Sequence, residues 1–215
     1  MKPTVVLLHG LARTARSMSR LQGAIEAAGY PTFSQSYPSR RLPIQVAAAE
    51  LAERIRAEVK GSELIAVTHS LGGILIRHMP ADLPWSGVVM LAPPNSGSRI
   101  ARLIHKNPLF HWFFGPAGKE LCNPEGWPAP PSPFAVIAGT RSASIGNPAS
   151  WLTRSLHLFS PDEPSDGTIA VSETRLAGEA DFAQVDADHT WIMNHPETQK
   201  MVLQFLVTRR LTDRR

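Results

Sequence analysis

The most regular feature of the chain is a series of short stretches in which nearly every position is apolar. Four such stretches occupy residues 5–8, 64–67, 87–92 and 134–139. Apolar side chains on both faces are typical of strands inside a parallel sheet that helices cover on both sides. Weaker patterns at residues 31–37 and 182–185 indicate two further strands. The sequence therefore predicts a sheet of about six strands.

Between these stretches, apolar residues recur at intervals of three and four, as on one face of an α-helix. Residues 16–28 show this spacing and stop at Gly29, a residue suited to the turn that ends a helix. Residues 43–59 form a second such segment, and residues 197–207, entered through Pro196, form the last. Strands that alternate with helices predict an α/β fold with a mostly parallel central sheet and helices on both faces. A length of 215 residues fits a single domain, residues 1–215.

The sharpest change of pattern lies at residues 64–73, where an apolar strand stops at Ser70 and a helix with two glycines begins. A strand that turns abruptly into a helix exposes the side chain at the turn, and the first N–H groups of the helix are free to stabilise a negative charge. Gly72 fits the pattern G-x-S-x-G, but Thr68 stands where that pattern has its first glycine. Taken alone, the stretch fits either a nucleophile at Ser70 or an ordinary strand-to-helix turn.

Residues 99–133 form the one long segment without a clear pattern of either kind. The segment is rich in aromatic and large apolar side chains and ends in a proline-rich stretch. Long segments of this kind inside a compact domain are usually functional or disordered, and this one is too aromatic for disorder. Phe110, Trp112, Phe113 and Phe114 are too close in sequence to share one helix face. We therefore expect some of them to bind an apolar part of a substrate, within a lid-like insertion.

Charge and composition narrow the choice of function. Lys and Arg exceed Asp and Glu by 22 to 18, and part of this excess lies in residues 208–215. Because no other basic patch recurs, a nucleic-acid partner is not expected. Cys122 is the single cysteine, so no internal disulfide can form. No apolar run has the length of a membrane span or a signal-peptide core, which favours a cytoplasmic protein. His105, His111 and Cys122 lack the spacing of a metal site, so no metal is expected.

Four features of the chain follow one another in a fixed order. They are His9-Gly10 after the first strand, Ser70 at the turn, Asp166 in a Ser-Asp-Gly-Thr stretch, and His189 after the last strand. In this order the chain resembles the α/β-hydrolase superfamily, specifically its small lipase- and esterase-like members, in which the serine, the acid and the histidine follow in this sequence. The resemblance covers most of the chain.

This resemblance implies a role for each residue. Ser70 would be the nucleophile, His189 the base that accepts its proton, and Asp166 the acid that orients the histidine. Leu11 and Leu71 would each provide a backbone N–H to an oxyanion hole. The implied activity is hydrolysis of carboxylic esters with an apolar acyl group, through an acyl-enzyme and without a cofactor.

Alternatives stay open at several points. Asp162 is a rival to Asp166, which is preferred because the glycine after it supplies a tight turn that can aim the carboxylate. His9 is expected to support the chain behind the oxyanion loop, and His195 to precede the last helix. An acyltransferase or a thioesterase would use the same triad. A non-catalytic acyl-binding protein on the same scaffold is a further alternative, because of Thr68. The oligomeric state is not predicted.

Overall fold

The computed structural model describes residues 2–60, 63–143, 146–160 and 162–212, which form an α/β fold. Within these ranges six parallel strands form one sheet in the order β2-β1-β3-β4-β5-β6. The strands are β1 (Thr4–Leu8), β2 (Thr32–Ser34), β3 (Leu64–His69), β4 (Trp85–Leu91), β5 (Phe134–Gly139) and β6 (Asp181–Val185). The predicted fold class is confirmed.

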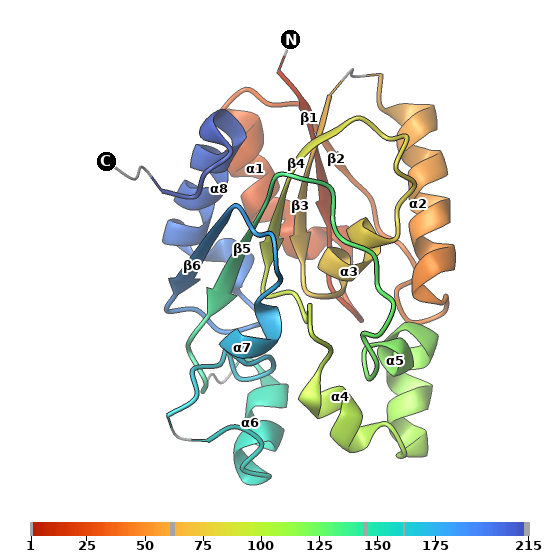
Figure 1. Ribbon diagram of the computed structural model, residues 1–215, viewed down its shortest axis with the longest axis vertical. Helices are drawn as coiled ribbons and strands as arrows, with labels where there is room; N and C mark the ends of the chain where they lie inside the picture. Colours follow the sequence, from red (N-terminus) through yellow and green to blue (C-terminus); the bar gives the residue numbers. More distant parts are fainter. Residues whose placement is uncertain (1, 61–62, 144–145, 161, 213–215) are drawn as a thin grey trace.

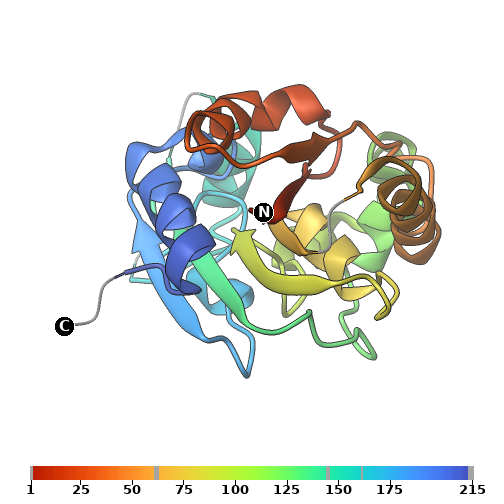
Figure 2. The ribbon, with the colours of Figure 1, turned by 90° about the horizontal axis from the view of Figure 1, so that it is seen from above.

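Helices cover both faces of this sheet and extend beyond one of its edges. The helices of the described residues are η1 (Ala15–Met18), α1 (Ser19–Ala27), α2 (Ile44–Glu58), α3 (Leu71–Arg77), α4 (Arg99–Ile104), α5 (Pro108–Glu120), α6 (Pro148–Ser155), α7 (Val171–Thr174), η2 (Ile192–Asn194) and α8 (Pro196–Thr208). Helices α1 and α8 lie against one face, and α2 and α3 against the other (Figures 1 and 2). None of the helices in the described residues is long and apolar enough to cross a membrane.

The continuous apolar strands divide their side chains between two cores. In β1, Val5 and Leu7 pack towards α1 and α8, while Val6 and Leu8 pack towards α2 and α3. Strands β3, β4 and β5 alternate in the same way, as side chains in an extended chain must. Burial on both faces is the reason why these strands carry no polar positions in their centres.

The prediction of an irregular segment at residues 99–133 is wrong in part, because α4 and α5 lie within it. Helix α5 is kinked at Gly115, which has a φ of 64° and a ψ of −161°. A side chain at Gly115 would meet the backbone carbonyl of Arg40, so this close approach requires glycine. The kink and Pro116 break the regular spacing that would reveal a helix in the sequence.

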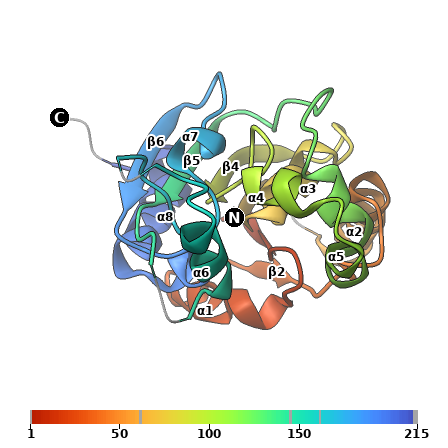
Figure 3. The ribbon, with the colours of Figure 1, turned by 90° about the horizontal axis from the view of Figure 1, so that it is seen from below.

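The carboxyl ends of the six parallel strands lie along one edge of the sheet. Helices α4 and α5, which connect β4 to β5, and helices α6 and α7, which connect β5 to β6, all lie beyond the carboxyl ends of the strands (Figures 1 and 3). Ligands in open α/β sheets bind at this edge. The sequence prediction included neither α6 nor α7.

Candidate active site

Ser70 lies at the tip of a sharp turn between β3 and α3. Its backbone has a φ of 49° and a ψ of −118°, a conformation that non-glycine residues rarely adopt. Two hydrogen bonds hold it: the Ser70 amide donates to the Leu91 carbonyl at 2.9 Å, and the Gly73 amide donates to the Ser70 carbonyl at 2.8 Å. A strained turn held in this way keeps the serine hydroxyl clear of the helix backbone.

Small residues around the turn allow its close packing. A side chain at Gly72 would lie 2.6 Å from the Leu8 carbonyl oxygen, so α3 can approach β1 only because glycine is there. Thr68, which departs from the usual motif, is accommodated beside Gly73. A Cβ atom added at Gly73 would lie 3.4 Å from the Thr68 hydroxyl oxygen. This hydroxyl donates to the Val89 carbonyl at 3.4 Å. The threonine is therefore compatible with the strand-to-helix turn.

The structure brings Ser70, His189 and Asp166 together from three different loops. Ring atom Nε2 of His189 lies 3.1 Å from Ser70 Oγ, and Nδ1 lies 2.6 Å from Asp166 Oδ2. Because a carboxylate can only accept, His189 Nδ1 carries the proton and Nε2 is left to accept one from the serine. Asp162, the rival acid, is exposed and has no hydrogen bond to His189.

Asp166 is fully buried and held by its own loop. Its Oδ1 accepts hydrogen bonds from the amides of Thr168 at 2.9 Å and Ile169 at 2.7 Å, which leaves Oδ2 for the histidine. Gly167, with a φ of 85°, supplies the tight turn expected after the aspartate. The carboxylate is therefore fixed in orientation before any substrate binds.

His69, the neighbour of the nucleophile, also holds the loop of His189. Its Nε2 donates to the His189 carbonyl at 2.9 Å, and the His189 amide donates to the Asp166 carbonyl at 3.0 Å. Burial is the main cause that lowers the pKa of His69 well below its usual value of 6.5, so its ring is neutral. The sequence prediction gave His69 no role, because this contact joins residues 120 positions apart.

The candidate oxyanion loop follows β1. The amide of Leu11 donates to no backbone or side-chain acceptor among the described residues, and Leu71, the first residue of α3, has an amide without an acceptor inside its helix. His9 supports this loop from behind: its ring stacks on Tyr37 at a centroid distance of 3.8 Å, and its Nε2 accepts from the Tyr37 amide at 3.2 Å. His9 forms no hydrogen bond with Ser70.

A cavity of about 470 Å³ opens at Ser70 and His189. Much of its lining is apolar and comes from the candidate oxyanion loop, from α4 and α5 with the turn after α5, and from the loop before α7. The residues of this apolar wall are Leu11, Ile100, Ala101, Ile104, Phe114, Leu121 and Ile169. Arg13, Asn147, Thr168 and Thr190 add polar groups, and Pro94 and Ser98 come from the loop after β4. The cavity offers an apolar surface next to the candidate nucleophile.

The aromatic residues predicted to bind substrate have different positions. Phe114 lines the cavity at Ser70. Trp112 does not line it: its side chain is 78% exposed and borders a neighbouring cavity. The side chains of Phe110 and Phe113 lie outside the described residues. Successive residues of an α-helix are about 100° apart around its axis, so Trp112 and Phe114, two positions apart, are separated by about 200° and face different spaces.

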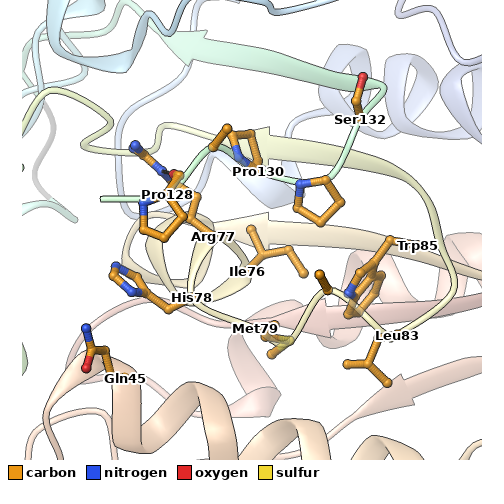
Figure 4. A pocket seen from close by; sticks show the side chains of 13 residues that line it. Gln45, Ile76, Arg77, His78, Met79, Leu83, Trp85, Pro128, Pro130 and Ser132 are labelled. Atoms are coloured by element: carbon orange, nitrogen blue, oxygen red, sulfur yellow. Dashed lines mark hydrogen bonds between the residues drawn. The ribbon is translucent and has the colours of Figure 1, made fainter. Parts of the chain in front are cut away.

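A separate cavity of about 610 Å³ lies between α3 and the proline-rich segment before β5. Ile76, His78 and Leu83 line it together with Pro128 and Pro130, as Figure 4 shows. It shares no residue with the cavity at Ser70. The cavity that carries the candidate chemistry is therefore the one at the carboxyl ends of the strands.

The chain is similar to known proteins in sequence family and in fold. A family model described as "Alpha/beta hydrolase family" matches residues 5–210. The mature lipase BlEst2 of Bacillus licheniformis has a TM-score of 0.78 and 22% identity, covering 95% of this chain and 92% of that one. The metagenomic carboxyl esterase MGS0156 has a TM-score of 0.71 and 17% identity, and the match covers 88% of this chain and 65% of that one. A thermophilic esterase from Thermogutta terrifontis has a TM-score of 0.61 and 11% identity, and the match covers 96% of this chain and 90% of that one. No curated protein matches.

The sheet, the strand-to-helix turn at Ser70 and the contact of that serine with a histidine are features of α/β hydrolases. The family match extends over nearly the whole chain, and the protein belongs to the Alpha/beta hydrolase family. The resemblance predicted from the sequence is confirmed. The solved structures are less than 25% identical to the chain, so they support the fold alone.

Proposed function

We propose that the protein is a serine hydrolase that cleaves carboxylic esters with an apolar acyl chain through an acyl-enzyme. The observation that carries this proposal is the His189 ring, which lies 3.1 Å from Ser70 Oγ on one side and 2.6 Å from Asp166 on the other. A serine hydroxyl is a poor nucleophile until a neighbouring base takes its proton. This arrangement provides that base in the correct tautomer.

In the first half-reaction, Ser70 Oγ forms a bond with the ester carbonyl carbon while its proton moves to His189 Nε2. The negative charge that develops on the carbonyl oxygen is stabilised by the backbone N–H groups of Leu11 and Leu71. Asp166 stabilises the imidazolium that forms. When the bond to the alcohol oxygen breaks, His189 gives its proton to that oxygen, and the acyl group stays on Ser70.

In the second half-reaction, water replaces the alcohol. His189 Nε2 accepts a proton from the water as its oxygen attacks the acyl carbon, and the same oxyanion hole accepts the charge. Breaking the bond to Ser70 Oγ returns the proton to the serine and releases the carboxylic acid. No cofactor enters either step.

The apolar wall of the cavity supports an apolar acyl group as the substrate class. Phe114, Ile104 and Leu121 offer a surface on which an acyl chain can leave water, and each buried methylene contributes about 0.8 kcal/mol. Helices α4 and α5 stand over the carboxyl ends of the strands, and we propose that residues 99–133 act as a lid-like cover of the site.

A fluorophosphonate probe tests the proposal, because it reacts with activated serines. We expect mass mapping to find the label on Ser70, and Ser70→Ala to lose both labelling and turnover of 4-nitrophenyl butyrate. Ser19→Ala, a change of an exposed serine in α1, should keep both. Labelling of another serine, or full turnover by Ser70→Ala, would contradict the proposal and favour a different nucleophile. Absence of both labelling and turnover in the wild type would favour a non-catalytic acyl-binding protein.

A further inference from the structure

Arg13 follows the candidate oxyanion loop and is half-buried in the wall of the cavity at Ser70. Its guanidinium has no hydrogen bond and no ion pair with any described residue. The guanidinium packs on the Trp191 ring, with its central carbon 5.9 Å from the ring centroid. A guanidinium carries five N–H donors, so one that meets no acceptor among the described residues can donate to an anionic ligand in the cavity.

The charge of Arg13 acts inside the site. It contributes to lowering the pKa of His9 and that of His69. Burial lowers the pKa of Arg13 itself from its usual value, and Asp188 opposes this shift. Asp188 forms no ion pair with Arg13 within 4 Å, and its Oδ1 accepts from the amides of Thr190 at 2.9 Å and Trp191 at 3.1 Å.

Arg13 also belongs to a second cavity, of about 480 Å³, that adjoins the first. The two cavities share Ala12 and Arg13. Arg40 and Arg41 line the second cavity as well, together with the exposed ring of Trp112, and its described lining contains no carboxylate. The positive charges of arginines that line one hollow raise the local concentration of anions there.

The two walls of the site therefore differ in chemistry. The wall from α4 and α5 is apolar, whereas the side formed by Ala12 and Arg13 leads to a cationic hollow. We propose that the natural substrate carries an anionic group, a carboxylate or a phosphate, on its alcohol portion, and that Arg13 binds this group. This inference rests on the ester hydrolysis proposed above. The acyl chain then occupies the apolar wall, and the anion extends towards Arg40 and Arg41.

Three butyrate esters with the same acyl group test this inference. They are propyl butyrate, which is neutral, 3-butyryloxypropanoate, which carries a carboxylate, and 3-butyryloxypropyl phosphate. Release of butyrate gives kcat/KM for each. We expect at least one anionic ester to exceed propyl butyrate by about tenfold in kcat/KM, the scale of a charge-assisted hydrogen bond. The ester with the higher value identifies the anion as a carboxylate or a phosphate.

Two variants and a control assign the preference to Arg13. Arg13→Gln should bring the ratio of anionic to neutral ester close to one, and Arg13→Lys should retain part of it because the charge remains. Arg20→Gln, a change of an exposed arginine in α1, should keep the wild-type ratio. Circular dichroism of each variant checks its folding.

The failure of this inference is distinguishable from the failure of the proposed function. If propyl butyrate is hydrolysed but neither anionic ester is preferred, or if the preference persists in Arg13→Gln, the anion site is refuted while the hydrolase remains. If none of the three esters is cleaved and the fluorophosphonate probe does not label Ser70, both proposals are refuted together.

Discussion

Residues with unusual backbone geometry gather around the candidate nucleophile. Ala12, Ser70 and Ala92 have positive φ values of 56°, 49° and 47°, and they follow the neighbouring strands β1, β3 and β4. Such conformations cost on the order of 1–3 kcal/mol each and persist only where the surrounding structure holds them. Strained turns at the same edge of three adjacent strands are therefore consistent with a functional role of that edge.

The acid of the proposed triad can be tested at the level of single atoms. Asp166→Asn keeps the shape of the side chain, but its amide can donate to His189 Nδ1 and so favours the tautomer with a proton on Nε2. That tautomer cannot accept the proton of Ser70, and we expect kcat to fall by about 10⁴-fold with the fold retained. The measurement is turnover of 4-nitrophenyl butyrate together with circular dichroism.

Asp162→Asn is the matched control for this experiment. Its carboxylate is exposed and does not touch His189, so kcat should stay within about twofold of the wild type. If Asp162→Asn loses activity and Asp166→Asn keeps it, the assignment of the acid is wrong.

At the scale of elements, the sequence predicts best those strands that are buried on both faces. The strand predicted at residues 134–139 agrees with β5 at both ends, because the apolar run has the length of a strand, follows Pro133 and ends at Gly139. The strand predicted at residues 31–37 is too long, since β2 ends at Ser34. Tyr37 has left the sheet to pack on His9, a contact over 28 positions that no local pattern encodes.

In the candidate site, too, features set by local sequence patterns are predictable, whereas contacts between distant residues are not. The order of Ser70, Asp166 and His189 is visible in the sequence because Ser70 and His189 each follow a strand and Asp166 belongs to a short motif. The contact of His69 with the His189 carbonyl and the position of Arg13 between two cavities depend on tertiary packing. Residue type and spacing carry no signal for either one.

Helices α4 and α5 should determine how the protein responds to acyl chain length. Ile104 and Phe114 line the apolar wall, so the double variant Ile104→Ala, Phe114→Ala should flatten the rise in kcat/KM from 4-nitrophenyl acetate to octanoate. Each methylene that loses its contact forfeits up to about 0.8 kcal/mol, a factor of about four in kcat/KM. The ratio of octanoate to acetate kcat/KM is the readout.

Leu103 offers the control within α4, because it is 50% exposed and lines neither cavity near Ser70. Leu103→Ala should keep the wild-type dependence on chain length. An unchanged ratio in the double variant would show that α4 and α5 do not contact the acyl chain, and the apolar acyl group would no longer be supported.

At the scale of the whole molecule, stability and the candidate site depend on the same buried polar groups. His9 is fully buried between β1 and Tyr37, donates from Nδ1 to the Gly10 carbonyl at 2.8 Å and accepts at Nε2 from the Tyr37 amide. This network fixes the oxyanion loop against the chain that follows β2. It requires a neutral ring, because a protonated Nε2 could not accept.

The pH dependence of unfolding should therefore carry a contribution from His9. Burial lowers the pKa of His9 from 6.5 to about 4 in the folded protein. Between these values the unfolded chain binds a proton that the folded protein does not, so the free energy of unfolding falls as the pH is lowered. The contribution is fully present above pH 6.5 and is lost progressively towards pH 4. His69, whose pKa is lowered by burial, acts in the same direction.

Urea unfolding at pH 7, 6 and 5 measures this effect. His9 alone should account for a loss of about 2 kcal/mol in the free energy of unfolding between pH 7 and pH 5. His9→Gln, which can still accept from the Tyr37 amide but does not titrate, should be less stable at pH 7 and show a correspondingly weaker pH dependence. His157→Gln, a change of an exposed histidine, should leave the dependence as in the wild type. If His9→Gln loses stability between pH 7 and pH 5 as steeply as the wild type does, titration of His9 is not the cause of the pH dependence, and this prediction is wrong.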